Sequence, residues 1–276
     1  MLVKLRLSLL VVFSACATFY LGASSFLLND YLFLIIGGLL VTWASNAINQ
    51  VLEKDTDKLM NRTSQRPLAT GRMDVSEAVL SAGIMFVIGV LSLLYFNPQT
   101  AVLGAISFAT YSFIYTPLKR VSPVAVWIGA IPGALPMSIG WVAATGDLGT
   151  AALVLFSIQF FWQFPHFWAI AWIANKDYTN AGFYLLPSSD NDGRNRSTAL
   201  QCVVYAMCLI PLAFVPYYIG MTGIVSAIVL LILAIIYAYY SINLFYKLTD
   251  KAARGLMFCS FFYLPLSLII LMIDKL

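Results

Sequence analysis

Charged residues are scarce in this chain. Asp, Glu, Lys and Arg make up 10% of its 276 residues, while 61% are hydrophobic. An ordinary soluble domain is therefore excluded, because too little polar surface is available to cover a core. We predict an all-α integral membrane protein that forms one membrane-embedded domain over residues 1–276. Long, continuous apolar runs indicate nine transmembrane helices rather than a β-barrel, at residues 8–28, 31–52, 78–96, 99–117, 122–143, 150–174, 199–219, 223–246 and 255–273.

Cysteine is also rare, and its positions speak against a zinc site or a disulfide framework. The four cysteines all fall within apolar runs and none has CxxC spacing: Cys16, Cys202, Cys208 and Cys259. We expect them to be small apolar residues. The first apolar run is longer than the core of a signal peptide, so we interpret it as the first membrane helix.

The basic residues are distributed asymmetrically along the chain. The nine helices place 15 of the 16 Lys and Arg on one side, and only Lys275 on the other. The positive-inside rule then predicts a cytoplasmic N-terminus and an external C-terminus, in the cytoplasmic (inner) membrane. The net charge of +4 follows from this asymmetry and requires no nucleic-acid partner.

The densest charge lies in the stretch NQVLEKDTDKLMNRTSQRPLATGR, residues 49–72. Asn49, Glu53 and Asp57 are four residues apart and would share one face of a helix, with acids of the kind that bind Mg²⁺. Arg62 and Arg66 follow, and arginine suits bidentate phosphate binding. Salt bridges on a solvated loop would explain the same spacing, so both interpretations stay open here.

Two further segments bring polar residues to the same side. Lys119 and Arg120 follow a membrane helix and would either bind phosphate or mark topology. In QFFWQFPHFWAIAWIANKDY, a polar stripe shares one face if the helix continues through its last acid. The stripe consists of Gln159, Gln163, His166 and Asp177. His166, the only histidine, is either a packing residue or a ligand.

Acidic helix ends, basic residues between them and a dry apolar interior suit ionisation of an allylic diphosphate. At these residues the sequence resembles the intramembrane UbiA-type prenyltransferase superfamily, and within it the branch that farnesylates haem. The matching pieces are the stretch above, YTPLKR, IGAIPGALPMSIGWVAATG and PHFWAIAWIANKDYTNAGFYLLP, in the right order.

The resemblance implies nine helices around a central chamber that opens to the cytoplasmic leaflet. It implies farnesyl diphosphate as donor, haem B as acceptor, haem O as product and Mg²⁺ as cofactor. A downstream haem A synthase becomes a candidate partner. By motif, Asn49, Glu53, Asp57 and Asp177 carry over as catalytic metal ligands, and Arg62, Arg66, Lys119 and Arg120 as diphosphate-binding residues. His166 becomes the candidate haem contact.

Two positions depart from the superfamily pattern. Glu53 stands where an aspartate is usual, and Ala181 stands where the second acidic motif has its second acid. Lys176, Asp190 and Asp192 are candidates to compensate for the second change, and the haem-farnesylating branch resembles this sequence in lacking that second acid. Two alternatives stay open: a prenyltransferase with a 4-hydroxybenzoate, naphthoate or chlorin acceptor, and a membrane transporter, in which polar helix stripes are equally expected.

Overall fold

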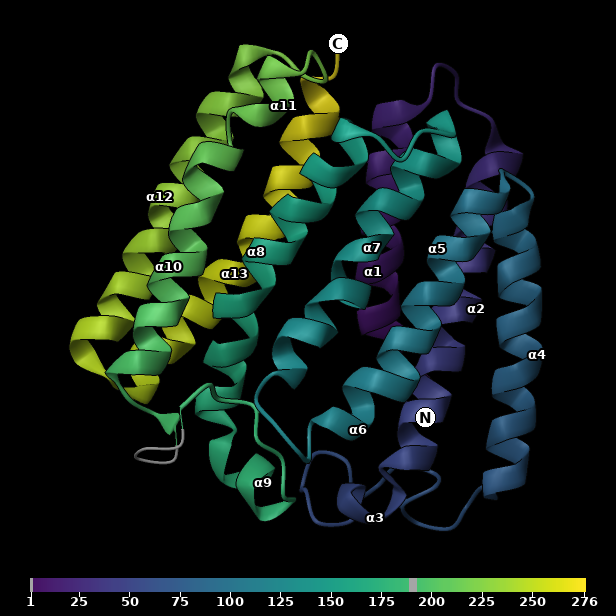
Figure 1. The fold of residues 1–276 in the computed structure, drawn as a ribbon, viewed down its shortest axis with the longest axis vertical. Coiled ribbons are helices and arrows are strands. Elements are labelled where there is room, and N and C mark those ends of the chain that lie inside the picture. The colour runs from purple at the N-terminus through teal and green to yellow at the C-terminus, as the bar shows by residue number, and fades with distance from the viewer. Residues whose placement is uncertain (1, 189–192) are drawn as a thin grey trace. The chain divides into compact units, whose positions relative to one another are not determined.

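The computed structural model describes residues 2–188 and 193–276, and these residues form helices and no β-strand (Figure 1). Asp190 and Asp192 lie outside the described residues. The helices are α1 (Leu5–Gly22), α2 (Leu28–Leu52), α3 (Lys54–Asp57), α4 (Val75–Leu94), α5 (Pro98–Ala109), the π-helix η1 (Thr110–Tyr115), α6 (Thr116–Leu118), α7 (Ala125–Thr145), α8 (Thr150–Ile173), α9 (Asn175–Asn180), α10 (Arg196–Leu212), α11 (Val215–Tyr218), α12 (Ile224–Lys247) and α13 (Asp250–Ile273).

Within the described residues, eight helical segments are long and apolar enough to cross a membrane. The apolar part of α1, Leu7–Gly22, is shorter than these eight. Each of the nine predicted transmembrane segments nevertheless consists mainly of helix, so the all-α membrane fold is confirmed and the count of nine is approximate.

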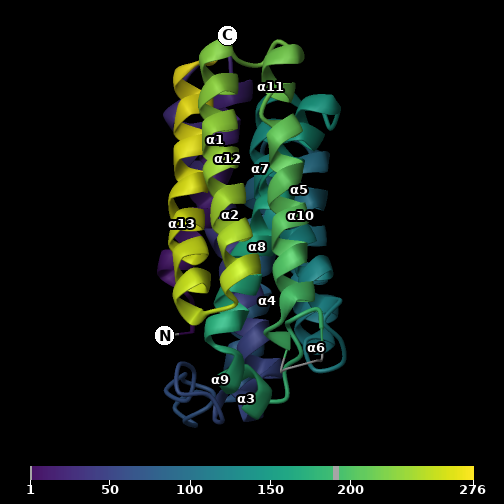
Figure 2. The same ribbon diagram turned by 90° about the vertical axis from the view of Figure 1, so that its left-hand side faces the viewer.

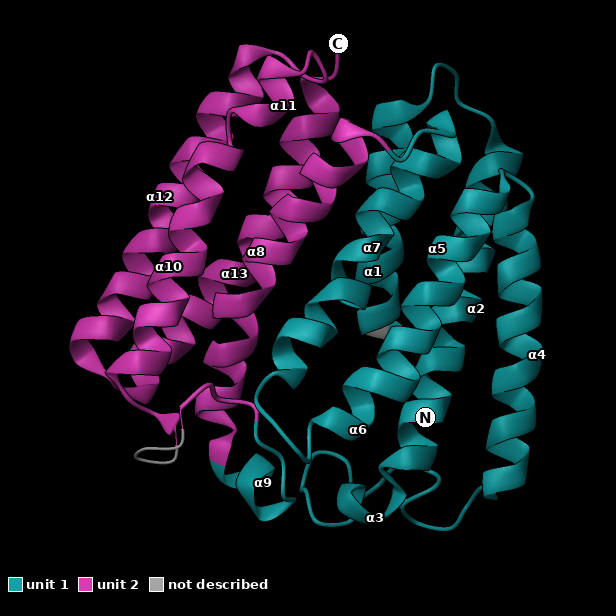
Figure 3. Ribbon diagram, in the orientation of Figure 1, with its two compact units in different colours: residues 1–148, 176–184 teal, residues 149–175, 185–276 magenta. Residues whose placement is uncertain are grey.

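The chain divides into two compact units, coloured separately in Figure 3. Unit 1 comprises residues 1–148 and 176–184, and unit 2 comprises residues 149–175 and 185–276. The single membrane-embedded domain predicted from the sequence remains a prediction.

In unit 1, α2 packs on α4 and α1 packs on α7, while α5 contacts α2, α4 and α7. Small residues allow the close approaches: a Cβ on Gly89 would lie 2.9 Å from the backbone nitrogen of Val41, and one on Gly140 would collide with the backbone of Ala15. Without a side chain, each glycine lets two helix backbones meet, as is usual where helices pack in a membrane.

One end of unit 1 gathers its charged segments. Figures 1 and 2 both show α3, α6 and α9 at this end. The N-terminal segment is held there as well, because the Gln50 side chain donates a 2.5 Å hydrogen bond to the carbonyl of Leu2. We call this the charged end of unit 1.

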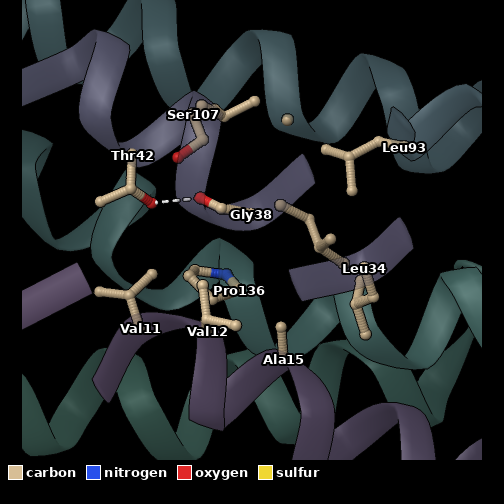
Figure 4. A pocket seen from close by; sticks show the side chains of 12 residues that line it. Val11, Val12, Ala15, Leu34, Gly38, Thr42, Leu93, Ser107 and Pro136 are labelled. Carbon is tan, nitrogen blue, oxygen red and sulfur yellow. Dashed lines mark hydrogen bonds between the residues drawn. The ribbon is translucent and has the colours of Figure 1, made fainter. Parts of the chain in front are cut away.

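Away from the charged end, unit 1 contains a mainly apolar pocket. The pocket among α1, α2, α4, α5 and α7 is lined by twelve residues, of which none is charged (Figure 4). The Thr42 hydroxyl donates within its own helix, to the Gly38 carbonyl at 2.7 Å. The pocket therefore presents a mostly hydrocarbon surface, with the hydroxyl groups of Thr42 and Ser107 in its lining.

Unit 2 is a bundle in which α8 packs on α10 and α13, and α12 packs on both of these helices. Its basic loops also meet at one end, since Arg194 lies 3.8 Å from Asp250. In each unit the loops rich in Lys and Arg thus lie together, as the predicted charge asymmetry requires.

Candidate active site

The three residues of the first acidic motif lie at the junction of α2 and α3. The sequence predicts one helix through them, and this is wrong: α2 ends at Leu52, and Glu53 leaves helical geometry at φ −101°, ψ 8°. Backbone bonds of the helical type still join them, from Glu53 to Asn49 at 3.0 Å and from Asp57 to Glu53 at 2.7 Å. All three side chains are consequently buried side by side.

Arg66 binds both carboxylates of this motif. Its Nη1 atom lies 2.7 and 2.6 Å from the two carboxylate oxygens of Asp57 and 3.9 Å from Oε2 of Glu53. Pro67 follows Arg66, and the chain from Lys58 to Met73 runs in turns that fold back over α3. The arginine predicted to bind diphosphate is thus paired with the acids predicted to bind metal.

Lys119, at the end of α6, is the second basic residue that contacts Glu53. Its ammonium forms an ion pair with Oε1 of Glu53 and lies 4.9 Å from the ring centre of Tyr115 and 5.2 Å from that of Phe183. The Lys119 carbonyl accepts a 2.9 Å hydrogen bond from the backbone of Tyr184. The Lys119 ammonium is therefore positioned between a carboxylate and two aromatic rings.

The π-helix η1 positions Thr116 against Asn49. The Thr116 hydroxyl donates to the Tyr111 carbonyl at 2.8 Å, and it accepts a 3.2 Å hydrogen bond from Nδ2 of Asn49. Segments of π-helix are frequent at functional sites because they shift the register of the residues that follow. The contact turns the carbonyl oxygen of Asn49 away from Thr116.

Two further predicted site residues, Arg62 and Arg120, contact residues at the same end of unit 1. Arg62 donates to the Tyr178 hydroxyl at 3.0 Å and its guanidinium lies 5.6 Å from that ring centre. Arg120 donates to the Thr56 hydroxyl at 3.1 Å. Among the described residues, neither arginine forms an ion pair with Glu53 or Asp57.

Asp177 lies on α9, beside Tyr178, and not on the helix that carries His166. The expected common face fails because α8 ends at Ile173 and Ala174 adopts φ −94°, ψ 16° before α9 begins. Within residues 2–188 and 193–276, no ion pair involves the Asp177 carboxylate, and no three acidic, cysteine or histidine side chains form a metal-sized cluster.

Burial dominates the electrostatics of the site. It raises the pKa of the Asp57 carboxyl above its ordinary value, against the opposing effect of the Arg66 guanidinium. It also lowers the pKa of Lys4 to about 7, assisted by the positive charges of Arg66 and Lys119. The Lys4 ammonium therefore interacts electrostatically with the charged residues of this site.

Sequence reasoning missed three residues of this site. In the sequence Lys4 is only one of the 15 basic residues on the predicted cytoplasmic side, yet the bond from Gln50 to Leu2 brings its segment to the charged end. Thr116 and Tyr178 have no distinctive spacing, although Thr116 precedes Lys119 by three residues in YTPLKR and Tyr178 directly follows Asp177 in NKDY. Only the fold brings these segments together.

The residues present fit a divalent cation. Asn49 supplies an amide oxygen, Oδ1, that is buried and has no hydrogen-bond partner among the described residues. Glu53 and Asp57 supply carboxylates within reach of a single guanidinium nitrogen. Oxygen ligands of this kind, completed by phosphate and water, are those that Mg²⁺ prefers.

His166 lies in unit 2 and is buried. Its Nδ1 atom is 2.7 Å from the Ser260 hydroxyl, and its ring stacks on Trp162 at a centroid distance of 4.8 Å. Gln159 and Gln163, the other members of the expected stripe, are also buried on α8.

These features agree with what comparison with known proteins finds. The UbiA prenyltransferase family pattern matches residues 9–264. The chain belongs to the UbiA prenyltransferase family. Within this family, a protoheme IX farnesyltransferase from Cytophaga hutchinsonii is 46% identical over 277 residues, covering 99% of this chain and 96% of that protein. The mitochondrial protoheme IX farnesyltransferase of Homo sapiens is 36% identical, covering 99% of this chain and 61% of that protein.

Solved UbiA structures share the fold at low identity. A digeranylgeranylglyceryl phosphate synthase matches with a TM-score of 0.83 at 15% identity, covering 99% of this chain and 95% of the other. A UbiA homologue from Archaeoglobus fulgidus bound to GPP and Mg²⁺ matches with a TM-score of 0.70 at 16% identity, covering 97% of each chain. Divalent metal is therefore used within the family.

Proposed function

We propose that this UbiA prenyltransferase transfers the farnesyl group of farnesyl diphosphate to a vinyl group of haem B, giving haem O and diphosphate. The observation that carries the proposal is the alignment of 99% of the chain with relatives named protoheme IX farnesyltransferase, at 46% and 45% identity. The charged end of unit 1 supplies a donor site that suits this chemistry.

Ionisation of the donor breaks the bond between farnesyl C1 and the diphosphate oxygen, so charge develops on the leaving group. Lys119, Arg62, Arg66 and Arg120 neutralise that charge, because guanidinium and ammonium groups bind phosphate oxygens strongly. Lys119 and Arg66 exchange their carboxylate partners for phosphate as the donor binds. The mainly apolar pocket of unit 1 shields the hydrocarbon part from water.

Asn49, Glu53 and Asp57 are the residues that would hold Mg²⁺, and Asp177 would contribute from α9. When bound, the cation neutralises the diphosphate as a Lewis acid. The free Oδ1 atom of Asn49 supports this assignment, since a buried oxygen without a partner is costly unless a ligand satisfies it.

In the acceptor half of the reaction, a carbon nucleophile attacks the farnesyl group and water then adds to the acceptor. A vinyl group of haem B forms the new bond to farnesyl C1, the resulting cation takes up water, and one proton is released. We assign His166 to the contact with haem. A haem A synthase, which would consume the product, is the partner that this chemistry suggests.

The membrane orientation belongs to the same proposal. The charged end of unit 1 faces the cytoplasm, in the inner membrane of a bacterium, because the basic loops lie there. A reporter fused to the C-terminus should be active only outside the cytoplasm, and cytoplasmic activity would reverse the orientation.

A membrane assay tests the proposed reaction. Membranes containing the protein receive farnesyl diphosphate and Mg²⁺ with haem B, or with 4-hydroxybenzoate in a parallel tube, and products are identified by mass. We expect a haem that has gained farnesyl plus water. Product with the aromatic acid alone would keep the donor site and change the acceptor. Folded protein that releases no diphosphate would favour the transporter alternative.

The matched variants are Asp57→Asn and Asp55→Asn. Both aspartates belong to α3, but Asp57 is buried against Arg66 whereas Asp55 is exposed and pairs with Lys58. Only the first change should abolish turnover. Near-normal turnover in Asp57→Asn would contradict the site assignment.

A further inference from the structure

The surroundings of His166 determine which of its ring nitrogens carries the proton. Ser260, on α13, lies 2.7 Å from the Nδ1 atom through its hydroxyl oxygen. The same hydroxyl donates a 2.5 Å hydrogen bond to the carbonyl of Met257, one turn earlier on α13. A serine hydroxyl has a single proton.

Because that proton goes to Met257, the oxygen of Ser260 can only accept a hydrogen bond from His166. Nδ1 must then carry the hydrogen, and the lone pair of the neutral ring lies on Nε2. Among the described residues, Nε2 has no hydrogen-bond partner. The ring thus offers one unused acceptor atom.

The ring is also fixed in orientation. Trp162 stacks on it at an interplanar angle of 17° and donates from its indole nitrogen to the Ser260 carbonyl at 3.0 Å. Tyr237, on α12, donates to the Trp162 carbonyl at 2.9 Å. Three helices of unit 2 therefore cooperate to hold His166 and Ser260 in register.

We propose that Ser260 is a positioning residue that presents Nε2 of His166 as a ligand to the iron of the haem acceptor. This inference rests on the proposed function and deepens it. Histidines that bind metal almost always donate their second ring N–H to a fixed acceptor, which sets the tautomer and the ring direction. Ser260 fills that role here.

Binding of two porphyrins by the full-length protein in detergent tests the proposal. Haem B contains iron that an imidazole can ligate, whereas metal-free protoporphyrin IX has the same ring and substituents without iron. Each is titrated into the wild type and the variants His166→Gln, Ser260→Ala and Ser260→Thr. The control is Ser267→Ala, because Ser267 is buried on α13 two turns beyond Ser260.

We expect His166→Gln to lose at least 10-fold in haem affinity and to lose the absorption change of imidazole-ligated iron, with protoporphyrin IX affinity unchanged. Ser260→Ala should weaken haem binding several-fold and alter the absorption spectrum. Ser260→Thr keeps the hydroxyl and should restore both, while Ser267→Ala should match the wild type.

Equal losses for both porphyrins in His166→Gln would overturn the proposal, since they would indicate packing rather than ligation. A wild-type spectrum in Ser260→Ala would overturn the positioning role. The mass assay on the wild type distinguishes failure of the ligation by His166 from failure of the proposed function. Haem O formation together with unchanged haem affinity in His166→Gln would reject only the ligation, whereas failure to bind haem or form haem O would reject the proposed function.

Discussion

Replacing Arg66 with alanine should destabilise the protein strongly, because it leaves a fully buried carboxylate without its cation. Asp57 is 0% exposed, and both its oxygens lie within 2.7 Å of the Arg66 guanidinium. Removing one partner of a buried ion pair costs about 3–5 kcal/mol, since the other charge remains in a region of low polarity. At roughly 2–4 °C per kcal/mol for a chain of this size, the melting temperature should fall on the order of 10 °C.

Thermal melting of the full-length protein in detergent measures this change. The double variant Asp57→Asn with Arg66→Ala removes the charge along with its partner, so it should recover most of the lost stability. Lys58→Ala is the matched control, since it breaks a 3.0 Å pair with Asp55 that is exposed on both sides and contributes little. The reasoning is refuted if Arg66→Ala melts like the wild type, or if the double variant is as unstable as the single one.

Three further predictions concern the donor site. Lys119→Met should raise the KM for farnesyl diphosphate about 10-fold or more, because a charge-assisted contact contributes roughly 1.5–3 kcal/mol. Steady-state kinetics measures this KM, and an unchanged value would contradict the assignment of Lys119 to diphosphate binding. Thr116→Val removes the 3.2 Å bond that orients Asn49, so half-maximal activity should require several-fold more Mg²⁺ in a metal titration, and an unshifted curve would speak against the metal role of Asn49. Lys4→Gln should raise the KM for the donor but not for haem, whereas Lys251→Gln should change neither, and equal effects of both variants would show that Lys4 serves orientation alone.

The residue types of the donor site could be predicted because their chemistry is local. Four-residue spacing keeps Asn49, Glu53 and Asp57 together even though the helix breaks at Glu53, since the backbone bonds from Glu53 to Asn49 and from Asp57 to Glu53 preserve the turn. The prediction was therefore right about proximity and wrong about a continuous helix. It also left a choice between salt bridges and a metal–diphosphate site, and the observed Asp57–Arg66 pair is compatible with both.

The contribution of other segments could not be predicted from spacing. Asp177 is eleven residues from His166, which suits one face of an unbroken helix. However, the helix ends before Ala174, and the two residues belong to different compact units. Lys4 lies far from the acidic motif along the chain, and the hydrogen bond from Gln50 to Leu2 brings its segment to the same end of unit 1. Such long-range contacts depend on helix packing, which residue spacing does not encode.

By itself the sequence determined that this is a multi-pass membrane protein, and it predicted the helix ends at which to look for a site. Apolar runs can satisfy their backbone only as helices in lipid, and clustered acids and arginines cannot remain within it. The tertiary structure decided which charges pair, through the turns that return Arg66 to Asp57 and the π-helix that turns Thr116 toward Asn49. It also brought Ser260, on another helix, to the Nδ1 atom of His166, which is the contact from which we infer the tautomer of that histidine.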